Sequence, residues 1–195
     1  MSRLFILTLN EAAELPLAPS DYEAVDAVSS PKRQREITAW RALLREGLRK
    51  MELTKEALST IAYNEVGAPY IVDSKLHISV SHCATAAAVL IAEEPCGVDI
   101  ERCDRNFERV AARYVTEAEI GVLSDLPRDK SLALIWSAKE ALYKAKGATD
   151  VDFIRDVEIV ATNGETIEAR ILNSRHNLKY IIDNEYVIAY TTGGN

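Results

Sequence analysis

The stretch ISVSHCATAAAVLIAEEPCGVDIE, residues 78–101, contains three predicted strands and ends in two acidic residues. Alternate residues of a strand face the same way, so Asp99 and Glu101 share one face, and Val98 and Ile100 share the other. Two carboxylates about 7 Å apart along a strand are able to bind one cation. The alternative is a strand that reaches the surface with both acids solvated. Another oxygen ligand elsewhere in the chain would favour a cation site over the solvated strand.

Before this stretch, the sequence predicts a strand, a long helix and a hairpin. The run LFILTL, residues 4–9, is a strand. Ser30 is able to cap a helix whose first turn contains Pro31, and apolar residues then recur every three or four positions as far as Met51. The turn sequence EVGA separates IAYN from PYIV, which predicts a hairpin over residues 61–72. The segments LHISV, 76–80, and AAAVLIA, 86–92, are two further strands.

After the turn at residues 93–95, the strand CGVDIE is followed by helices and then by more strands. Helices are predicted over 107–115, over 116–123 with Thr116 and Glu119 as a capping box, and over 131–147 with Gly147 at the end. Four strands follow, with turns at residues 163–164 and 183–184: DVEIV, ETIEARIL, LKYIID and YVIAYTT. Both halves contain a tryptophan-bearing helix followed by strands, so the sequence predicts an α+β fold with two similar halves.

Composition narrows the class of protein. The 195 residues are 48% apolar, enough for a substantial core, and their formal net charge is −7, which argues against nucleic-acid binding. The LFILTL run is too short for a membrane span or a signal-peptide core. Cys83, Cys96 and Cys103 have no C-x-x-C spacing, and together with His82 they match no common zinc pattern. These features predict a cytoplasmic protein without structural disulfides.

One segment reverses the overall negative charge. Between residues 31 and 50 only Glu36 and Glu46 oppose seven cationic residues: Lys32, Arg33, Arg35, Arg41, Arg45, Arg49 and Lys50. Such a surface suits a phosphorylated small ligand, and a solvated helix face is the alternative interpretation.

The third oxygen ligand is predicted in the helix that contains WSAKEALYK. Trp136, Glu140 and Lys144 are four residues apart and share a face. They are equally compatible with a surface Glu140–Lys144 ion pair beside a tryptophan in the core. If Glu140 instead faces Asp99 and Glu101, the three carboxylates suit Mg²⁺, with phosphate or water oxygens completing its coordination.

These motifs resemble those of the 4'-phosphopantetheinyl transferases. GVDIE and, about forty residues later, WSAKEALYK match the family signatures G-[IV]-D-[IV]-E and W-x-x-K-E-[AS]-x-x-K. The segments SVSH, RYVTEAE and SPKRQRE resemble three further elements of the family, S-x-S-H, R-F-F-S-x-x-E and S-P-x-K-R. The resemblance therefore extends over most of the chain and fades in the last forty residues.

The resemblance implies transfer of the 4'-phosphopantetheine arm of coenzyme A to a serine of an acyl or peptidyl carrier protein, with release of adenosine 3',5'-bisphosphate. It implies the larger, monomeric class, whose two halves pack as a pseudo-dimer with the active-site cleft between them. We accordingly expect an N-terminal half at 1–95 and a C-terminal half at 96–195. The partners expected are coenzyme A and the carrier, with neither nucleic acid nor a membrane.

Residue roles follow from the same resemblance. Asp99, Glu101 and Glu140 correspond to the Mg²⁺ ligands, and Lys144 to a residue that contacts the pyrophosphate of coenzyme A. Residues that match or lie near the 3'-phosphate site are Lys32, Arg35, Arg41, Ser81 and His82. For His82 alone, a core histidine beside a strand is the alternative. The base that deprotonates the carrier serine is predicted to be Glu140, with Glu119 or a water on the metal as alternatives.

The chain departs from the family pattern in three places. Residues 67–70 read GAPY where the family often has G-K-P-Y beside the adenine, so Ala68 lacks a lysine contact. The glycine usual after S-H is absent, and the segment before Arg41 is shorter than in typical members. Two other functions share these residues: a coenzyme A- or carrier-binding protein without turnover, and an unrelated Mg²⁺-dependent phosphohydrolase.

Overall fold

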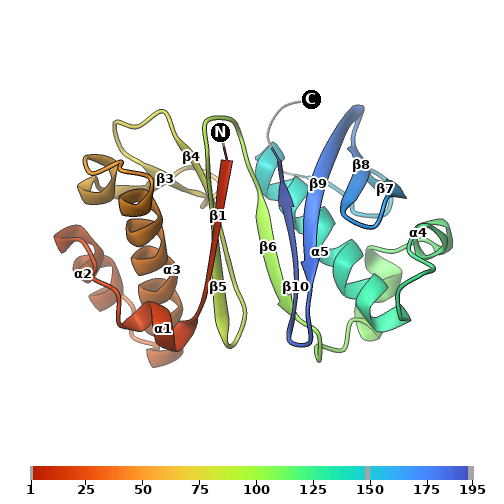
Figure 1. Ribbon diagram of the computed structural model, residues 1–195, viewed down its shortest axis with the longest axis horizontal. Helices are drawn as coiled ribbons and strands as arrows, with labels where there is room; N and C mark the ends of the chain where they lie inside the picture. The colour runs from red at the N-terminus through yellow and green to blue at the C-terminus, as the bar shows by residue number, and fades with distance from the viewer. Residues whose placement is uncertain (1, 148–149, 193–195) are drawn as a thin grey trace. The chain divides into compact units, whose positions relative to one another are not determined.

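The computed structural model describes residues 2–147 and 150–192, which form two compact units, Met1–Pro95 and Cys96–Asn195 (Figure 1). We call them the N-terminal unit and the C-terminal unit. Each combines helices with antiparallel strands, so the predicted α+β class is confirmed. The internal duplication stays a prediction, because the sheets of the two units differ in size and strand order.

The N-terminal unit is a three-stranded antiparallel sheet with a long helix packed against it. Its elements are β1 (Ser2–Thr8), α1 (Leu9–Ala13), α2 (Pro19–Asp26), α3 (Pro31–Lys50), β2 (Ile61–Tyr63), β3 (Pro69–Ile71), β4 (His77–His82) and β5 (Ala86–Ala92), with a short 3-10 turn at Glu56–Leu58. The sheet order is β1-β5-β4, and β2 pairs with β3 as the predicted hairpin. Ser30 caps α3 through its hydroxyl, which accepts the Arg33 N–H.

The C-terminal unit is a five-stranded antiparallel sheet covered by one long helix. Its elements are β6 (Val98–Arg102), a 3-10 helix (Glu108–Arg113), α4 (Glu117–Val122), α5 (Arg128–Lys146), β7 (Val157–Thr162), β8 (Thr166–Ile171), β9 (Ser174–Ile182) and β10 (Tyr186–Thr191). The sheet order is β6-β10-β9-β8-β7, which places β6 at an edge. Gly147 ends α5 at a φ of 59°, a left-handed conformation that glycine adopts readily.

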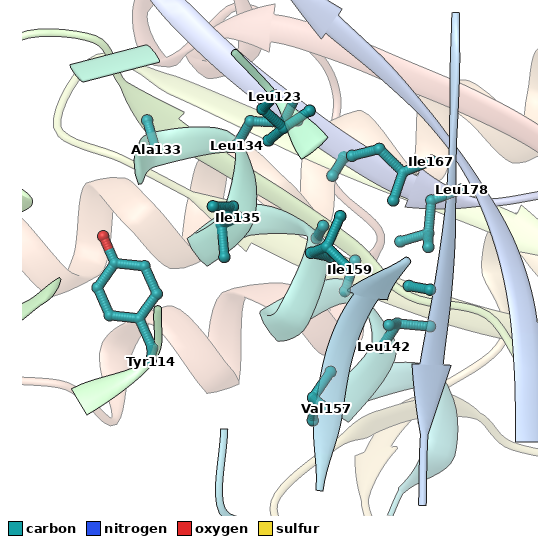
Figure 2. Close-up of a cluster of buried hydrophobic side chains, with 14 of the residues drawn as sticks. Tyr114, Leu123, Ala133, Leu134, Ile135, Leu142, Val157, Ile159, Ile167 and Leu178 are labelled. Carbon is teal, nitrogen blue, oxygen red and sulfur yellow. The ribbon is translucent and has the colours of Figure 1, made fainter. Parts of the chain in front are cut away.

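The core of the C-terminal unit lies between α5 and the sheet (Figure 2). Leu134 of α5 gathers there with apolar side chains of three strands, Ile159, Ile167 and Leu178. These residues are 2% exposed or less. The alternation of apolar residues in the strands and their helical spacing in α5 therefore place the two faces against each other, as the sequence predicts.

Three segments differ from their sequence-based assignment. Residues 107–115 were expected to form an α-helix but contain only a 3-10 helix, Glu108–Arg113. The helices α1 and α2 lie where the sequence indicated only a polar connection.

In the part of the chain that the structure describes, no helix has the length and apolar character needed to span a bilayer.

Candidate active site

The two family motifs meet within the C-terminal unit. Asp99 and Glu101 lie on β6, Glu140 and Lys144 lie on α5, and α5 packs against β6 and β10. Asp99 is only 5% exposed, whereas the other three side chains are half-buried. The fold thus brings the predicted metal ligands and the predicted phosphate-binding lysine to neighbouring elements.

Gly97 permits the close approach of β6 to α5. A Cβ atom at this position would lie 1.8 Å from the carbonyl oxygen of Ala141, so no other residue fits without a shift of the backbone. The Gly97 N–H donates to Thr191 Oγ1 at 2.9 Å, and its carbonyl accepts the Thr191 N–H at 2.9 Å. One sign of this role is visible in the sequence, namely a glycine directly before a buried strand.

Lys144 connects α5 to β6. Its Nζ atom donates to Asp99 Oδ1 at 2.8 Å and to the Val98 carbonyl oxygen at 2.9 Å. Because the Asp99 side chain is only 7% exposed, this charge-assisted hydrogen bond is shielded from water. Lys144 therefore pairs with Asp99 and not with Glu140, its expected partner in a plain surface ion pair.

Glu101 has two partners that the sequence did not indicate. Arg105 forms an ion pair with it, and the Trp136 side chain hydrogen bonds to it. Trp136 also packs edge-on against Tyr114 and Phe153, with ring centroids 5.0 and 6.1 Å away. Trp136 thus joins the apolar core to the acidic site. Arg105 lies in a connection without periodicity, so its orientation could not be inferred from sequence.

The three acids influence one another electrostatically. Burial, and then the negative charge of Asp99, raises the pKa of Glu101 to about 7. The same two causes, in the same order, raise the pKa of Glu140. Lys144 and Arg105 act in the opposite direction on both carboxyls. The site is therefore a concentration of negative charge that two side-chain cations offset only in part.

The chemistry of this donor set fits a hard divalent cation. Carboxylate oxygens are the ligands that Mg²⁺ prefers, and mutual repulsion among buried acids is relieved by a cation. Among residues 2–147 and 150–192, however, no three His, Cys, Asp or Glu side chains are grouped as ligands of one metal ion. Here Lys144 and Arg105 engage Asp99 and Glu101, so the metal-ligand role of the three acids stays a prediction.

Glu119, an alternative candidate for the base, is part of a buried structural network. It is 1% exposed and accepts hydrogen bonds from the Thr116 N–H at 2.8 Å and the Ile159 N–H at 3.0 Å. Its Oε1 also lies 2.6 Å from Nζ of Lys139, which is fully buried and donates to the Phe153 carbonyl. A carboxylate with these partners caps α4 and anchors β7, and a catalytic role for Glu119 stays a prediction.

In the N-terminal unit, one cluster of charged side chains connects the start of α3 to the end of β4. Glu36 lies 3.4 Å from Arg33, 3.9 Å from Lys32 and 3.9 Å from His82. Arg33 also lies 3.3 Å from His82 Nε2, and Ser81, which precedes His82 on β4, is buried. The predicted residues Lys32, Ser81 and His82 are therefore neighbours, and Arg33 and Glu36 are members that sequence reasoning missed.

The two other arginines predicted at the 3'-phosphate lie elsewhere. Arg41 is 1% exposed, and its Nη1 donates to Asp21 Oδ1 at 2.7 Å. Asp21 is fully buried and also accepts from Arg45 at 2.8 Å through each of its oxygens. Arg41 thus neutralises a buried acid, and its contact with the 3'-phosphate stays a prediction. Arg35 is exposed on α3 and, among the described residues, takes no part in the Glu36 cluster.

Comparison with known proteins identifies the family. Residues 95–191 match the model of the 4'-phosphopantetheinyl transferase superfamily. Enterobactin synthase component D of Escherichia coli K12 is 29% identical over 120 residues, which are 59% of this chain and 58% of that protein. The protein named 4'-phosphopantetheinyl transferase gsp, from Aneurinibacillus migulanus, is 30% identical over 87 residues, 43% of this chain and 36% of that protein.

The chain belongs, through residues 95–191, to the 4'-phosphopantetheinyl transferase superfamily. The matched region covers almost all of the C-terminal unit, including β6 and α5 with their motifs. The chain matches 58% or less of the length of these curated relatives.

Proposed function

We propose that the protein transfers the 4'-phosphopantetheine arm of coenzyme A to a serine hydroxyl of an acyl or peptidyl carrier protein. The reaction would depend on Mg²⁺ and release adenosine 3',5'-bisphosphate. The observation that carries this proposal is the packing of α5 against β6 in the unit that matches the superfamily. This packing places four residues on adjacent elements: Asp99, Glu101, Glu140 and Lys144.

We propose a role for all four residues of this group. Asp99, Glu101 and Glu140 would hold the metal ion, which when bound offsets negative charge on the pyrophosphate of coenzyme A. Lys144 would add a second positive charge at that pyrophosphate while it restrains Asp99. Glu140 is the proposed base, because one of its carboxyl oxygens could contact the metal while the other accepts the serine proton.

Intact-mass spectrometry tests the proposal. Incubation with coenzyme A and Mg²⁺ is expected to add one phosphopantetheine arm to a carrier in a panel drawn from fatty-acid, polyketide and peptide synthesis. The Asp99→Ala variant is expected to be slower by about 100-fold or more while its melting transition persists. Asp104→Ala is the matched control, because Asp104 is an exposed acid that pairs with Arg102 beyond the site.

A second function of the same fold is binding of coenzyme A or of a carrier without turnover. Retention of the three acids and Lys144 favours the transferase, since binding alone does not need a metal site. If no carrier in the panel gains mass while calorimetry still detects coenzyme A binding, the binding protein is the correct function.

We further propose that Lys32, Arg33, Ser81 and His82 contact the 3'-phosphate of coenzyme A. The support is the cluster of cationic side chains around Glu36, together with the resemblance of SVSH to a family element. The His82→Ala variant should lose preference for coenzyme A over its 3'-dephospho form. The His77→Ala variant, changed at the exposed start of the same strand, should keep that preference; an unchanged preference in His82→Ala would exclude His82.

We also propose a cellular location, an oligomeric state and excluded partners for the protein. We expect a monomer in the cytoplasm that does not bind membranes, and the net charge of −7 argues against nucleic-acid binding. No disulfide joins Cys83, Cys96 and Cys103 in the described part of the chain. Size-exclusion chromatography with light scattering checks the oligomeric state.

A further inference from the structure

Arg105 is a cation built into the acidic site. It lies three residues beyond the end of β6 and pairs through Nη1 with Oε1 of Glu101. The guanidinium carbon also lies 4.8 Å from the centroid of the Phe107 ring and 5.1 Å from that of Trp136. Two aromatic faces and one carboxylate therefore fix a side chain that is 43% exposed.

These contacts make the pair stronger than an ordinary surface ion pair. An exposed pair four residues apart is weak, because two mobile side chains must be ordered and water screens the charges. Here the aromatic rings already restrict the guanidinium, and the Glu101 side chain is only 15% exposed. Glu101 is further restrained by its hydrogen bond with Trp136.

The positive charge of Arg105 affects a second carboxyl group besides that of Glu101. It acts on Glu140 as well as on Glu101 and favours the ionised form of both carboxyls. Lys144, which lies on α5, forms a comparable ion pair with Asp99. Each acid of β6 that is predicted to bind the metal therefore already has a side-chain cation beside it.

We propose that Arg105 is a positioning residue that competes with a divalent cation for Glu101 and thereby sets the affinity of the site for the metal. Arg105 keeps the Glu101 carboxylate oriented and compensated, and a metal ion that binds Glu101 must replace this contact. Removal of Arg105 therefore strengthens metal binding, in contrast to the loss expected when a ligand is removed. The proposal rests on the proposed metal-dependent transfer.

Titration of Mn²⁺, followed by the electron paramagnetic resonance signal of the free ion, tests this without carrier or turnover. The Arg105→Ala and Arg105→Gln variants of the full chain should bind Mn²⁺ about 3- to 10-fold more tightly than wild type. Arg105→Lys, which keeps a positive charge but loses the planar group held by the two rings, should tighten binding less than Arg105→Ala does. Near-ultraviolet circular dichroism establishes that each variant is folded.

Arg102→Ala is the matched control, because it removes the same charge from the end of β6 but from a pair with Asp104. Its Mn²⁺ affinity should remain within about 2-fold of wild type. Equal tightening in Arg102→Ala and Arg105→Ala would indicate general electrostatics and overturn the proposal, as would unchanged or weaker binding in both Arg105→Ala and Arg105→Gln. If wild type binds no Mn²⁺, the metal site itself is wrong, whereas binding without carrier modification contradicts only the transferase.

Discussion

At the residue scale, Glu101 links the stability of the protein to pH. Its pKa is raised from 4.5 to about 7, so the folded state holds the proton more tightly than the unfolded chain. Its contribution to stability is therefore complete below pH 4.5 and is lost as the pH rises through about 7. This loss is on the order of 1–3 kcal/mol, allowing for partial screening by solvent.

We expect the Glu101→Gln variant, which stays neutral, to lose less stability than wild type between about pH 5 and about pH 8. Urea unfolding in the presence of a chelator at each pH measures the difference. Glu117→Gln is the control, because Glu117 is an exposed acid in the first turn of α4. Parallel stability curves for wild type and Glu101→Gln would show that this carboxyl does not titrate differently in the folded protein.

The spacing of residues indicated which acids lie on neighbouring elements, but it did not reveal the partners of other charged residues. Asp99 and Glu140 were placed near each other from two motifs and a helical period, and their elements do pack together. The buried partners Asp21 of Arg41 and Lys139 of Glu119 were not predicted, because they lie elsewhere in the sequence. Nothing in the segment around Arg41 reveals that Asp21, twenty residues earlier, binds it inside the unit.

At the element scale, the contact between β6 and α5 depends on Gly97. We expect Gly97→Ala to reduce the free energy of unfolding by at least about 2 kcal/mol, because the added Cβ would overlap the carbonyl oxygen of Ala141. Carrier modification should fall with it, since β6 carries Asp99 and Glu101. Denaturant unfolding and the mass assay measure the two effects.

Gly121→Ala is the matched control for this substitution. Gly121 lies in α4, and an added Cβ there has nothing within 4 Å, so the change should be neutral or slightly stabilising. Equal stability of the two variants would mean that β6 and α5 do not approach as closely as described.

Long periodic elements were predictable, whereas the two short helices α1 and α2 were not. The helix α5 and strands β7 to β10 follow directly from apolar spacing and turn residues, for example Asn163, whose side chain accepts the Glu165 and Thr166 N–H groups. The helix α1 has only five residues, too few to show a period. Its signal was a capping box between Thr8 and Glu11, and that of α2 was Pro19 in its first turn.

At the scale of the whole molecule, each unit has its own core and its own buried ion network. The buried residues of one apolar cluster lie between positions 12 and 91, and those of the other lie between positions 107 and 189. Asp21 with Arg41 and Arg45 lies in the N-terminal unit, and Glu119 with Lys139 lies in the C-terminal unit. Removing one member of a buried pair leaves an uncompensated charge, which typically destabilises a protein by about 3–5 kcal/mol.

Hydrogen exchange measured by mass spectrometry therefore tests whether the predicted halves are separate cooperative units. Asp21→Ala should reduce protection mainly in α3 and β5, and Glu119→Ala mainly in α4, α5 and β7, because each change leaves a buried cation without its acid. The two variants serve as controls for each other, since both remove one buried carboxylate. If either variant lowers protection equally in peptides from residues 2–95 and 96–192, the chain unfolds as one unit and the boundary at residue 95 has no energetic meaning.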